Sequence, residues 1–262
     1  MEFISELISE FIPADLSPIE AVGLIAFSYL TSAVSATFGL GGGVMMLVAM
    51  ASIMPPLAVI PVHGAVQVGS NGGRAWMLRQ HINWSIFRYF LIGSLIGAAA
   101  ASQIVVALPR DVLRLILGLF VLYIVWGPKP TQRDIGDVAY IPVGIGTTFA
   151  SMFVGATGLL IGAFMPPGKL GRLTTVSMQA VCAMLQHGLK ILVFGLLGFA
   201  FWEWLPLVLT MIATGFLGTF TGKALLERIP EKAFGWMFKT LLTVLAIRLI
   251  TLAGIELWEE MG

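Results

Sequence analysis

Residues 63–74, His-Gly-Ala-Val-Gln-Val-Gly-Ser-Asn-Gly-Gly-Arg, carry polar side chains along one face of an otherwise apolar stretch. At 3.6 residues per helical turn, that face combines His63, Gln67, Ser70, Asn71 and Arg74. A second such face follows about 112 positions later, with Thr175, Gln179, Cys182, Gln186 and Lys190. Polar groups at membrane depth are costly and normally face a cavity or another helix. The two faces therefore indicate two walls of one polar pathway in a duplicated membrane protein.

The composition is that of a membrane protein. Hydrophobic residues make up 58% of the 262 and charged residues 11%, whereas soluble domains average roughly 25% charged residues. No Asp, Glu, Lys or Arg occurs in 21–73 or in 138–168, and each run exceeds the roughly 20 residues of one crossing. The net charge of +1 does not suggest a nucleic-acid partner, and the single Cys182 excludes an internal disulfide.

We predict an all-α polytopic fold with eight long apolar segments. They lie near residues 18–38, 57–79, 86–107, 110–127, 139–165, 169–199, 203–226 and 231–254. The piece 43–54 is too short to cross alone. It lies between a glycine break at 39–43 and Pro55-Pro56. We interpret it as a re-entrant or half-helix segment, which requires surrounding protein or a water-filled cavity, rather than as an external loop.

The order of these features is duplicated within a single transmembrane domain, 1–262. Two homologous four-segment repeats are predicted, at about 18–127 and 139–254. In the second, Pro166-Pro167 follows a break at Gly155-Ala156-Thr157-Gly158, and Gln179 matches Gln67. Four crossings per half would make the repeats parallel and an extra crossing in each would invert them, so both arrangements stay open.

The distribution of basic residues predicts the orientation. An even number of crossings puts both termini on one side of the membrane. Counted over eight simple crossings, the opposite side has Arg110, Arg114, Lys169, Arg172, Lys223, Arg228 and Lys232. The side of the termini has Arg79, Arg88, Lys129 and Arg133. By the positive-inside rule, both termini lie outside the cytoplasm.

Several motifs resemble one membrane family. They are the run Gly39-Leu-Gly-Gly-Gly43, the proline-bounded short segment after it, and a helix opened by Pro61 that carries His63, Ala65 and Gln67. This order, over roughly residues 18–252, resembles the TauE/SafE permeases. The resemblance implies a bacterial-type inner-membrane transporter of small sulfur-containing anions such as sulfite or organosulfonates. The second break departs from the glycine-rich pattern, so the two halves are expected to contribute unequally.

An oxyanion site needs several hydrogen-bond donors and positive potential. Gly41, Gly42 and Gly43 can present backbone N–H groups at a helix N-terminus, which carries about half a positive charge. The amides of Gln67 and Gln179 each offer two donors. The further candidates are His63, Ser70, Asn71, Arg74, Thr175, Cys182, Gln186 and Lys190. His187 lies off the polar face, and we expect a structural role for it.

The acidic residues lie near segment ends or in connections. A buried carboxylate relay is therefore not expected, and His63 or His187 would have to carry any coupled proton. An inside-negative potential favours anion exit by about 2.3 kcal/mol per charge per 100 mV. We therefore expect electrogenic export without an obligatory proton. The alternative is uptake coupled to an ion at a carbonyl-lined site in the glycine break.

Two other classes remain as alternatives. An intramembrane hydrolase would need Ser70 beside a histidine, but His63 lies two turns away, about 10 Å by the helical rise. His187 would have to approach across the repeat interface. A scaffold protein predicts neither duplicated polar faces nor a midplane break. The sequence suggests no metal cluster, nucleotide loop or redox-cofactor site, so a non-enzyme without cofactors is expected. The anion's identity and the oligomeric state stay open.

Overall fold

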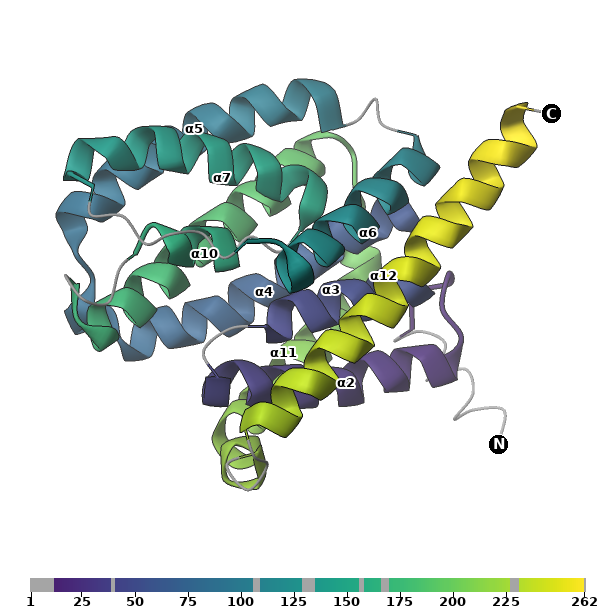
Figure 1. The fold of residues 1–262 in the computed structure, drawn as a ribbon, viewed down its shortest axis with the longest axis horizontal. Coiled ribbons are helices and arrows are strands. Elements are labelled where there is room, and N and C mark those ends of the chain that lie inside the picture. Colours follow the sequence, from purple (N-terminus) through teal and green to yellow (C-terminus); the bar gives the residue numbers. More distant parts are fainter. Residues whose placement is uncertain are drawn as a thin grey trace.

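The computed structural model describes residues 12–38, 41–105, 109–128, 135–155, 158–165, 170–226 and 231–261. Within these ranges all regular elements are helices, as predicted (Figure 1). Five stretches are long and apolar enough to span a membrane: Pro18–Ala36, Trp84–Val105, Asp137–Val154, Leu173–Leu196 and Phe201–Thr221. The chain is therefore an all-α polytopic membrane protein.

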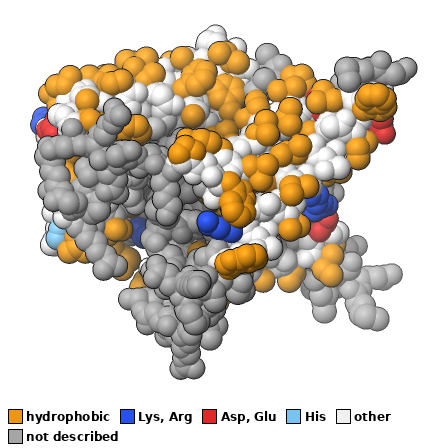
Figure 2. All heavy atoms as spheres, in the orientation of Figure 1, with side chains coloured by type: hydrophobic (Ala, Val, Ile, Leu, Met, Phe, Trp, Pro, Cys, Tyr) orange, Lys and Arg blue, Asp and Glu red, His pale blue; other side chains and the backbone are white. Residues whose placement is uncertain are grey.

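The outer surface is apolar in the way that lipid requires. Figure 2 shows hydrophobic side chains over most of the described surface on one face, with few charges between them. Large side chains that are at least half exposed include Trp76, Leu95, Leu209, Phe220 and Ile247. Soluble monomers rarely expose contiguous apolar areas of this kind.

The first half of the chain contains five main helices. They are α2 (Pro18–Phe38), α3 (Gly42–Ile53), α4 (Pro56–Met77), α5 (Trp84–Val105) and α6 (Arg110–Trp126), with the short η1 (Arg79–His81) before α5. The predicted half-helix is confirmed as α3, whose 12 residues span about 18 Å. Pro61 does not open α4: the helix begins at Pro56, because Pro55 is its N-cap and proline suits the first helical position.

The second half follows the same order. It contains η2 (Asp137–Ala139), α7 (Tyr140–Val154), α8 (Gly158–Ala163), α10 (Arg172–Leu196), α11 (Phe201–Leu226) and α12 (Glu231–Met261). The apolar segment 139–165 is interrupted at the predicted break: Gly155, with φ of 76°, follows the end of α7, and α8 begins at Gly158. The paired prolines 166–167 lie outside the described residues.

The pairs α4–α10 and α6–α12, each with one helix from either half of the chain, run antiparallel. Gly64 of α4 packs against Lys190 of α10, whereas Leu78, which follows α4, accepts a hydrogen bond from Ser177 near the start of α10. In the same way, α6 and α12 are joined by an ion pair between Arg114 and Glu256 and by a hydrogen bond from Trp126 to Thr243. In both pairs, the residue numbers of the contacts increase along one helix while they decrease along the other.

Two other helix pairs, α5–α7 and α2–α11, run parallel. Gly93 and Gly97 of α5 lie against the carbonyls of Ile141 and Ile145 of α7, so close that a Cβ would come within 2.0 and 2.4 Å of these oxygens. Gly218 of α11 meets the Tyr29 carbonyl of α2 in the same manner, at 2.1 Å. These glycines let backbones approach within van der Waals contact.

The helix directions show that α3 returns the chain between α2 and α4. The tight turn 197–200 makes α11 antiparallel to α10. Because α10 is antiparallel to α4, α11 is parallel to α4. Because α2 also runs with α11, α2 and α4 point the same way (Figure 1). Arg79 and Arg88 therefore lie at the end of the bundle opposite the start of α2. The sequence-based count of basic residues assumed eight simple crossings and left out α3. Its placement of Arg79 and Arg88 on the side of the termini is therefore wrong.

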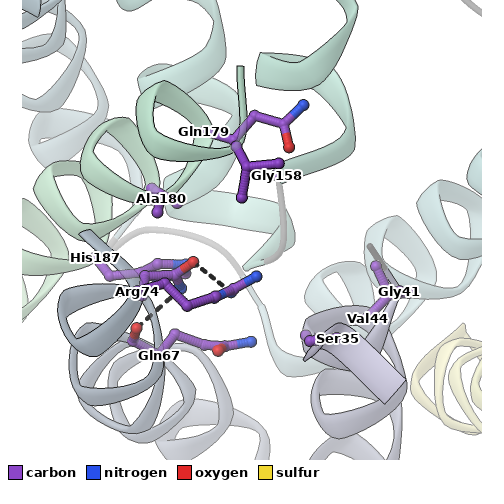
Figure 3. A pocket seen from close by; sticks show the side chains of 13 residues that line it. Ser35, Gly41, Val44, Gln67, Arg74, Gly158, Gln179, Ala180 and His187 are labelled. Carbon is purple, nitrogen blue, oxygen red and sulfur yellow. Dashed lines mark hydrogen bonds between the residues drawn. The ribbon is translucent and has the colours of Figure 1, made fainter. Parts of the chain in front are cut away.

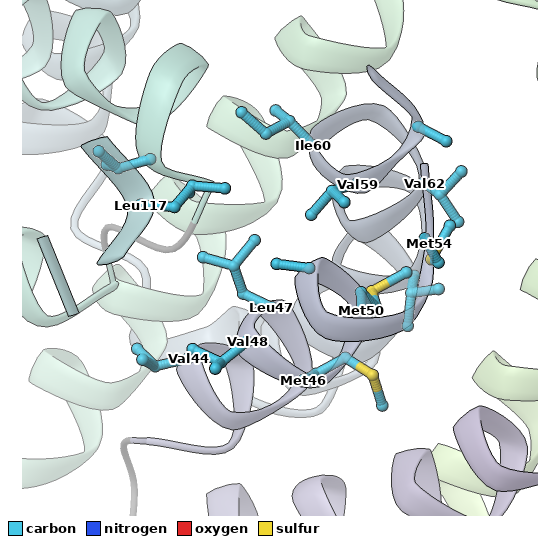
Figure 4. Close-up of a cluster of buried hydrophobic side chains, with 14 of the residues drawn as sticks. Val44, Met46, Leu47, Val48, Met50, Met54, Val59, Ile60, Val62 and Leu117 are labelled. Atoms are coloured by element: carbon cyan, nitrogen blue, oxygen red, sulfur yellow. The ribbon is translucent and has the colours of Figure 1, made fainter. Parts of the chain in front are cut away.

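The core surrounds α3. Its side chains Val44, Met46, Leu47, Val48 and Met50 are almost fully buried, against Val59, Ile60 and Val62 of α4 and Leu117 of α6 (Figure 4). A helix that is apolar all round is one buried on every side. The N-terminus of α3, beginning at the buried Gly42, is thereby held inside the bundle.

Candidate functional site

A cavity of about 60 Å³ opens between α4 and α10, beside the N-terminus of α3. At about 10–15 Å³ per water-sized volume, it has room for a small anion. Figure 3 shows Gln67, Arg74 and His187 on one side of it and Ser35, Gly41 and Val44 on the other. The lining residues are Ser35, Gly41, Gly43, Val44, Gln67, Asn71, Arg74, Gly158, Val176, Gln179, Ala180, Ala183 and His187.

The cavity lies at half the length of α4. The Gly43 carbonyl accepts a hydrogen bond from His63 Nε2 at 2.9 Å. His63 and Gln67 occupy the middle of this 22-residue helix, which is about 33 Å long. A hydrocarbon core is about 30 Å thick. The N-terminus of α3 therefore lies at half the length of α4, and Gly41 and Gly158 line the same cavity.

The two glutamine amides each lie against a glycine of the short helix in their own half. A Cβ on Gly43 would come within 2.3 Å of Gln67 Nε2, and a Cβ on Gly162 within 2.7 Å of Gln179 Nε2. Any side chain at either glycine would displace the amide. The glycines therefore make room for the glutamines as well as for the turn.

The contacts of His63 orient the Gln67 amide. His63 Nε2 lies 2.9 Å from the Gly43 carbonyl and 3.2 Å from Gln67 Nε2. A ring nitrogen that donates to a carbonyl has no lone pair for a second donor. Both contacts of His63 Nε2 are favourable when the Gln67 amide is assigned with its oxygen, rather than its nitrogen, facing the ring. In that assignment the amide NH₂ is free to donate into the cavity.

The remaining polar residues of α4 form a ladder along the cavity. Asn71 Nδ2 donates to the Gln67 carbonyl at 2.9 Å, and Arg74 Nη2 donates to Asn71 Oδ1 at 2.8 Å. No Asp or Glu is among the described residues that line the cavity. The Arg74 guanidinium therefore keeps donors available without a competing carboxylate.

Lys190 lies behind the cavity rather than in its wall. Its side chain is fully buried, its amine donates to the Gly155 carbonyl, and Nζ lies 3.3 Å from His187 Nδ1. The His187 ring meets the His63 ring edge-on, with centroids 5.6 Å apart. His187 lines the cavity although it lies off the polar face of α10; its expected structural role stays a prediction.

Seven sequence candidates do not line the cavity: His63 and Lys190, whose contacts are given above, and five others. Gly42 lies against Thr31 of α2, where a Cβ would come within 1.9 Å of the carbonyl oxygen. Gln186 donates to Thr147 and Thr148 of α7, at 2.9 and 3.1 Å. Cys182 and Thr175 are buried and Ser70 is half-buried. No hydrogen bond joins Ser70 to a histidine in the described part of the chain.

Sequence reasoning missed Ser35. Ser28, Thr31, Ser32 and Ser35 recur at helical spacing on α2, and all but Ser35 are fully buried. This third polar face was a readable signal, but its short hydroxyl residues are common in packed membrane helices. Among the described residues, no group of three His, Cys, Asp or Glu side chains can hold a metal ion.

The fold and the cavity define a class. Helices that are long and apolar enough to span a membrane surround the short helix α3, whose N-terminus faces a cavity together with amide and guanidinium donors; this arrangement is typical of a transporter. The Sulfite exporter TauE/SafE family model matches residues 24–249. The chain therefore belongs to the TauE/SafE family. No curated protein and no solved structure matches the chain.

Proposed function

We propose that this chain carries small sulfur-containing oxyanions, of the sulfite or sulfonate type, outward across the inner membrane. The observation that supports this most directly is the convergence of Gln67, Arg74, Gln179 and the α3 N-terminus on one cavity whose described lining has no carboxylate. An oxyanion has several acceptor oxygens and no donor when fully ionised, so a wall of donors suits it.

In this proposal the anion lies at the N-terminus of α3. The Gly41 conformation, with φ of 105°, frees the first backbone N–H groups of α3. These donors and the helix dipole favour negative charge at that position. Gln67 and Gln179 bind the anion from α4 and α10, and Asn71 and Arg74 extend the donor surface along the cavity.

The two halves are then repeats of inverted topology. Three observations support this: α4 and α10 are antiparallel, α6 and α12 are antiparallel, and close glycine contacts pair α5 with α7 as they pair α11 with α2. A pseudo-twofold axis between α4 and α10 relates these contacts. Transporters of this construction bind substrate at the repeat interface and alternate access around it.

Export follows from the charges. A membrane potential that is negative inside drives anions outward by about 2.3 kcal/mol per charge per 100 mV. The cavity offers the anion no acidic group in its described lining, so no carboxylate proton relay adjoins the site. We infer that transport is electrogenic without an obligatory proton. Because Arg79 and Arg88 lie at the end of the bundle opposite the start of α2, we also infer from the positive-inside rule that the termini lie outside the cytoplasm.

Flux in reconstituted vesicles tests the proposal. Vesicles loaded with labelled sulfite, and in parallel with other sulfur oxyanions, are clamped at an inside-negative potential or depolarised. We expect faster sulfite loss under the clamp and almost no change when the pH gradient alone is collapsed. His63→Gln serves as the control for a histidine proton relay. Flux that ignores voltage and stops with the pH gradient contradicts the proposal.

A further inference from the structure

The proposed function leaves the most deeply buried cation of the described chain without a role. The Lys190 side chain has no exposed surface, and its stem lies against Gly64 of α4, where a Cβ would be 3.5 Å from both Lys190 Cβ and Cδ. Among the described residues the ion pair lies elsewhere, between Arg114 and Glu256. A charge at membrane depth without a counter-charge is costly, which usually marks a functional position.

The partner of this amine is the C-terminal end of a broken helix. Gly155 follows the last residue of α7 and is its C-cap. The carbonyls at a helix C-terminus carry about half a negative charge. In transporters with discontinuous helices, such carbonyls coordinate the inorganic cation that accompanies the substrate. Here the Lys190 amine makes the contact with the carbonyl.

The remaining groups around Lys190 are neutral or cationic. His187 lies one turn earlier on α10, and His63 faces it from α4. His187 lies between Lys190 and the cavity. Lys190 therefore adds to the positive potential that Arg74 already gives the cavity. In a medium of low dielectric constant, that potential acts more strongly than it would in water.

We propose that Lys190 is a tethered cation that occupies the carbonyl site of the second break, where it replaces an inorganic coupling ion and acts as counter-charge to the anion in the cavity. The second part of this inference, the role of Lys190 as counter-charge to the anion, rests on the proposed function. It separates the chain from carriers that bind a free cation at a broken helix. The charge is covalently attached, so anion movement requires no sodium or potassium.

Flux experiments test the counter-charge. In vesicles whose only other cation is choline, wild-type sulfite efflux should equal the rate measured in sodium. Lys190→Met removes the charge and should slow efflux by about tenfold or more, as expected for loss of a charge-assisted contact. Lys190→Gln keeps a donor for the Gly155 carbonyl without the charge and should be slowed similarly. Lys239→Met, at an exposed position on α12, is the matched control and should leave efflux unchanged.

A second readout does not depend on transport. The detergent-solubilised wild type should melt at the same temperature in sodium and in choline. Lys190→Ala should melt lower and be restabilised by methylammonium or sodium, which can enter the vacated carbonyl site. Wild-type stabilisation by sodium, an Ala variant that ignores all cations, or a folded Gln variant with wild-type efflux overturns the inference. Absence of sulfite flux in every wild-type condition contradicts the proposed function instead, and the melting data then decide the cation site.

Discussion

At the scale of single residues, Gln67 and Gln179 line one cavity but differ in the contacts that support them. The Gln67 amide is oriented by His63, which is itself anchored to the Gly43 carbonyl. The Gln179 amide lies against Gly162 and lines the same cavity. The first amide is preorganised and the second is more adaptable. Such a pair can hold an anion from one fixed side and adjust on the other.

We expect Gln67→Leu and Gln179→Leu each to weaken sulfite binding by about tenfold or more. A hydrogen bond to a charged group contributes roughly 1.5–3 kcal/mol, and leucine has a similar volume but no donor. Isothermal titration of the purified protein measures the change directly.

The matched control is Gln103→Leu, because Gln103 is exposed on α5 and contacts only the neighbouring Ser102 among the described residues. Its variant should bind sulfite as the wild type does. Normal binding by both cavity variants, with folding intact, would place the site elsewhere in the protein.

Residue types alone predicted part of the site. The spacing of His63, Gln67, Asn71 and Arg74 on one apolar helix placed them on a common face, and the hydrogen-bond ladder follows that face. The spacing did not predict that Lys190 turns to the Gly155 carbonyl. That contact depends on where the second break lies in space, and a helical period carries no information about it.

At the scale of the helices, close backbone contact is the feature most sensitive to mutation. We expect Gly93→Ala and Gly218→Ala to destabilise the protein by about 1–3 kcal/mol, the usual cost of overpacking. In both cases the new Cβ would meet a backbone carbonyl, at 2.0 Å from Ile141 and 2.1 Å from Tyr29. Thermal unfolding in detergent measures the loss.

Gly146→Ala and Gly254→Ala are the controls, since neither glycine has an atom within 4 Å of its added Cβ. They should melt at or slightly above the wild-type temperature, because alanine favours the helix. If Gly93→Ala also melts there, α5 and α7 pack less closely than these contacts require.

Element boundaries were predictable where proline or charge marks them. Pro18 opens α2 and Trp126 ends α6, as the apolar segments predict. The glycines at 155 and 158 predicted the division of 139–165, although the run stays apolar on both sides and hydropathy does not change at the break. The direction of α3 was missed because hydropathy marks only long segments. A 12-residue helix is too short to register as a crossing, yet it reverses the chain.

At the scale of the whole molecule, α3 decides which loops share a side of the membrane. We expect Asp15→Cys and Leu197→Cys to react with a membrane-impermeant thiol reagent on intact cells. Gln80→Cys and Val138→Cys should react only after permeabilisation. All four positions are exposed, and the native Cys182 is buried and gives little background.

The outcome separates two topologies. With eight simple crossings, positions 15 and 80 would lie on one side and react together. With α3 as a return segment, they lie on opposite sides. Reaction of Gln80→Cys and not Asp15→Cys on intact cells would keep the fold but reverse its orientation, which would contradict the proposed location of the termini.

The methionines of α3 and its C-cap have a practical consequence. Four of the chain's 13 methionines, Met45, Met46, Met50 and Met54, belong to this helix or directly follow it, and all four are buried. Thioether side chains adapt to a shifting neighbour more readily than branched ones. Isotope labelling of methionine methyl groups would therefore place NMR reporters along the half-helix without any mutation. Line broadening of these four signals on addition of sulfite would record whether α3 moves when the anion binds.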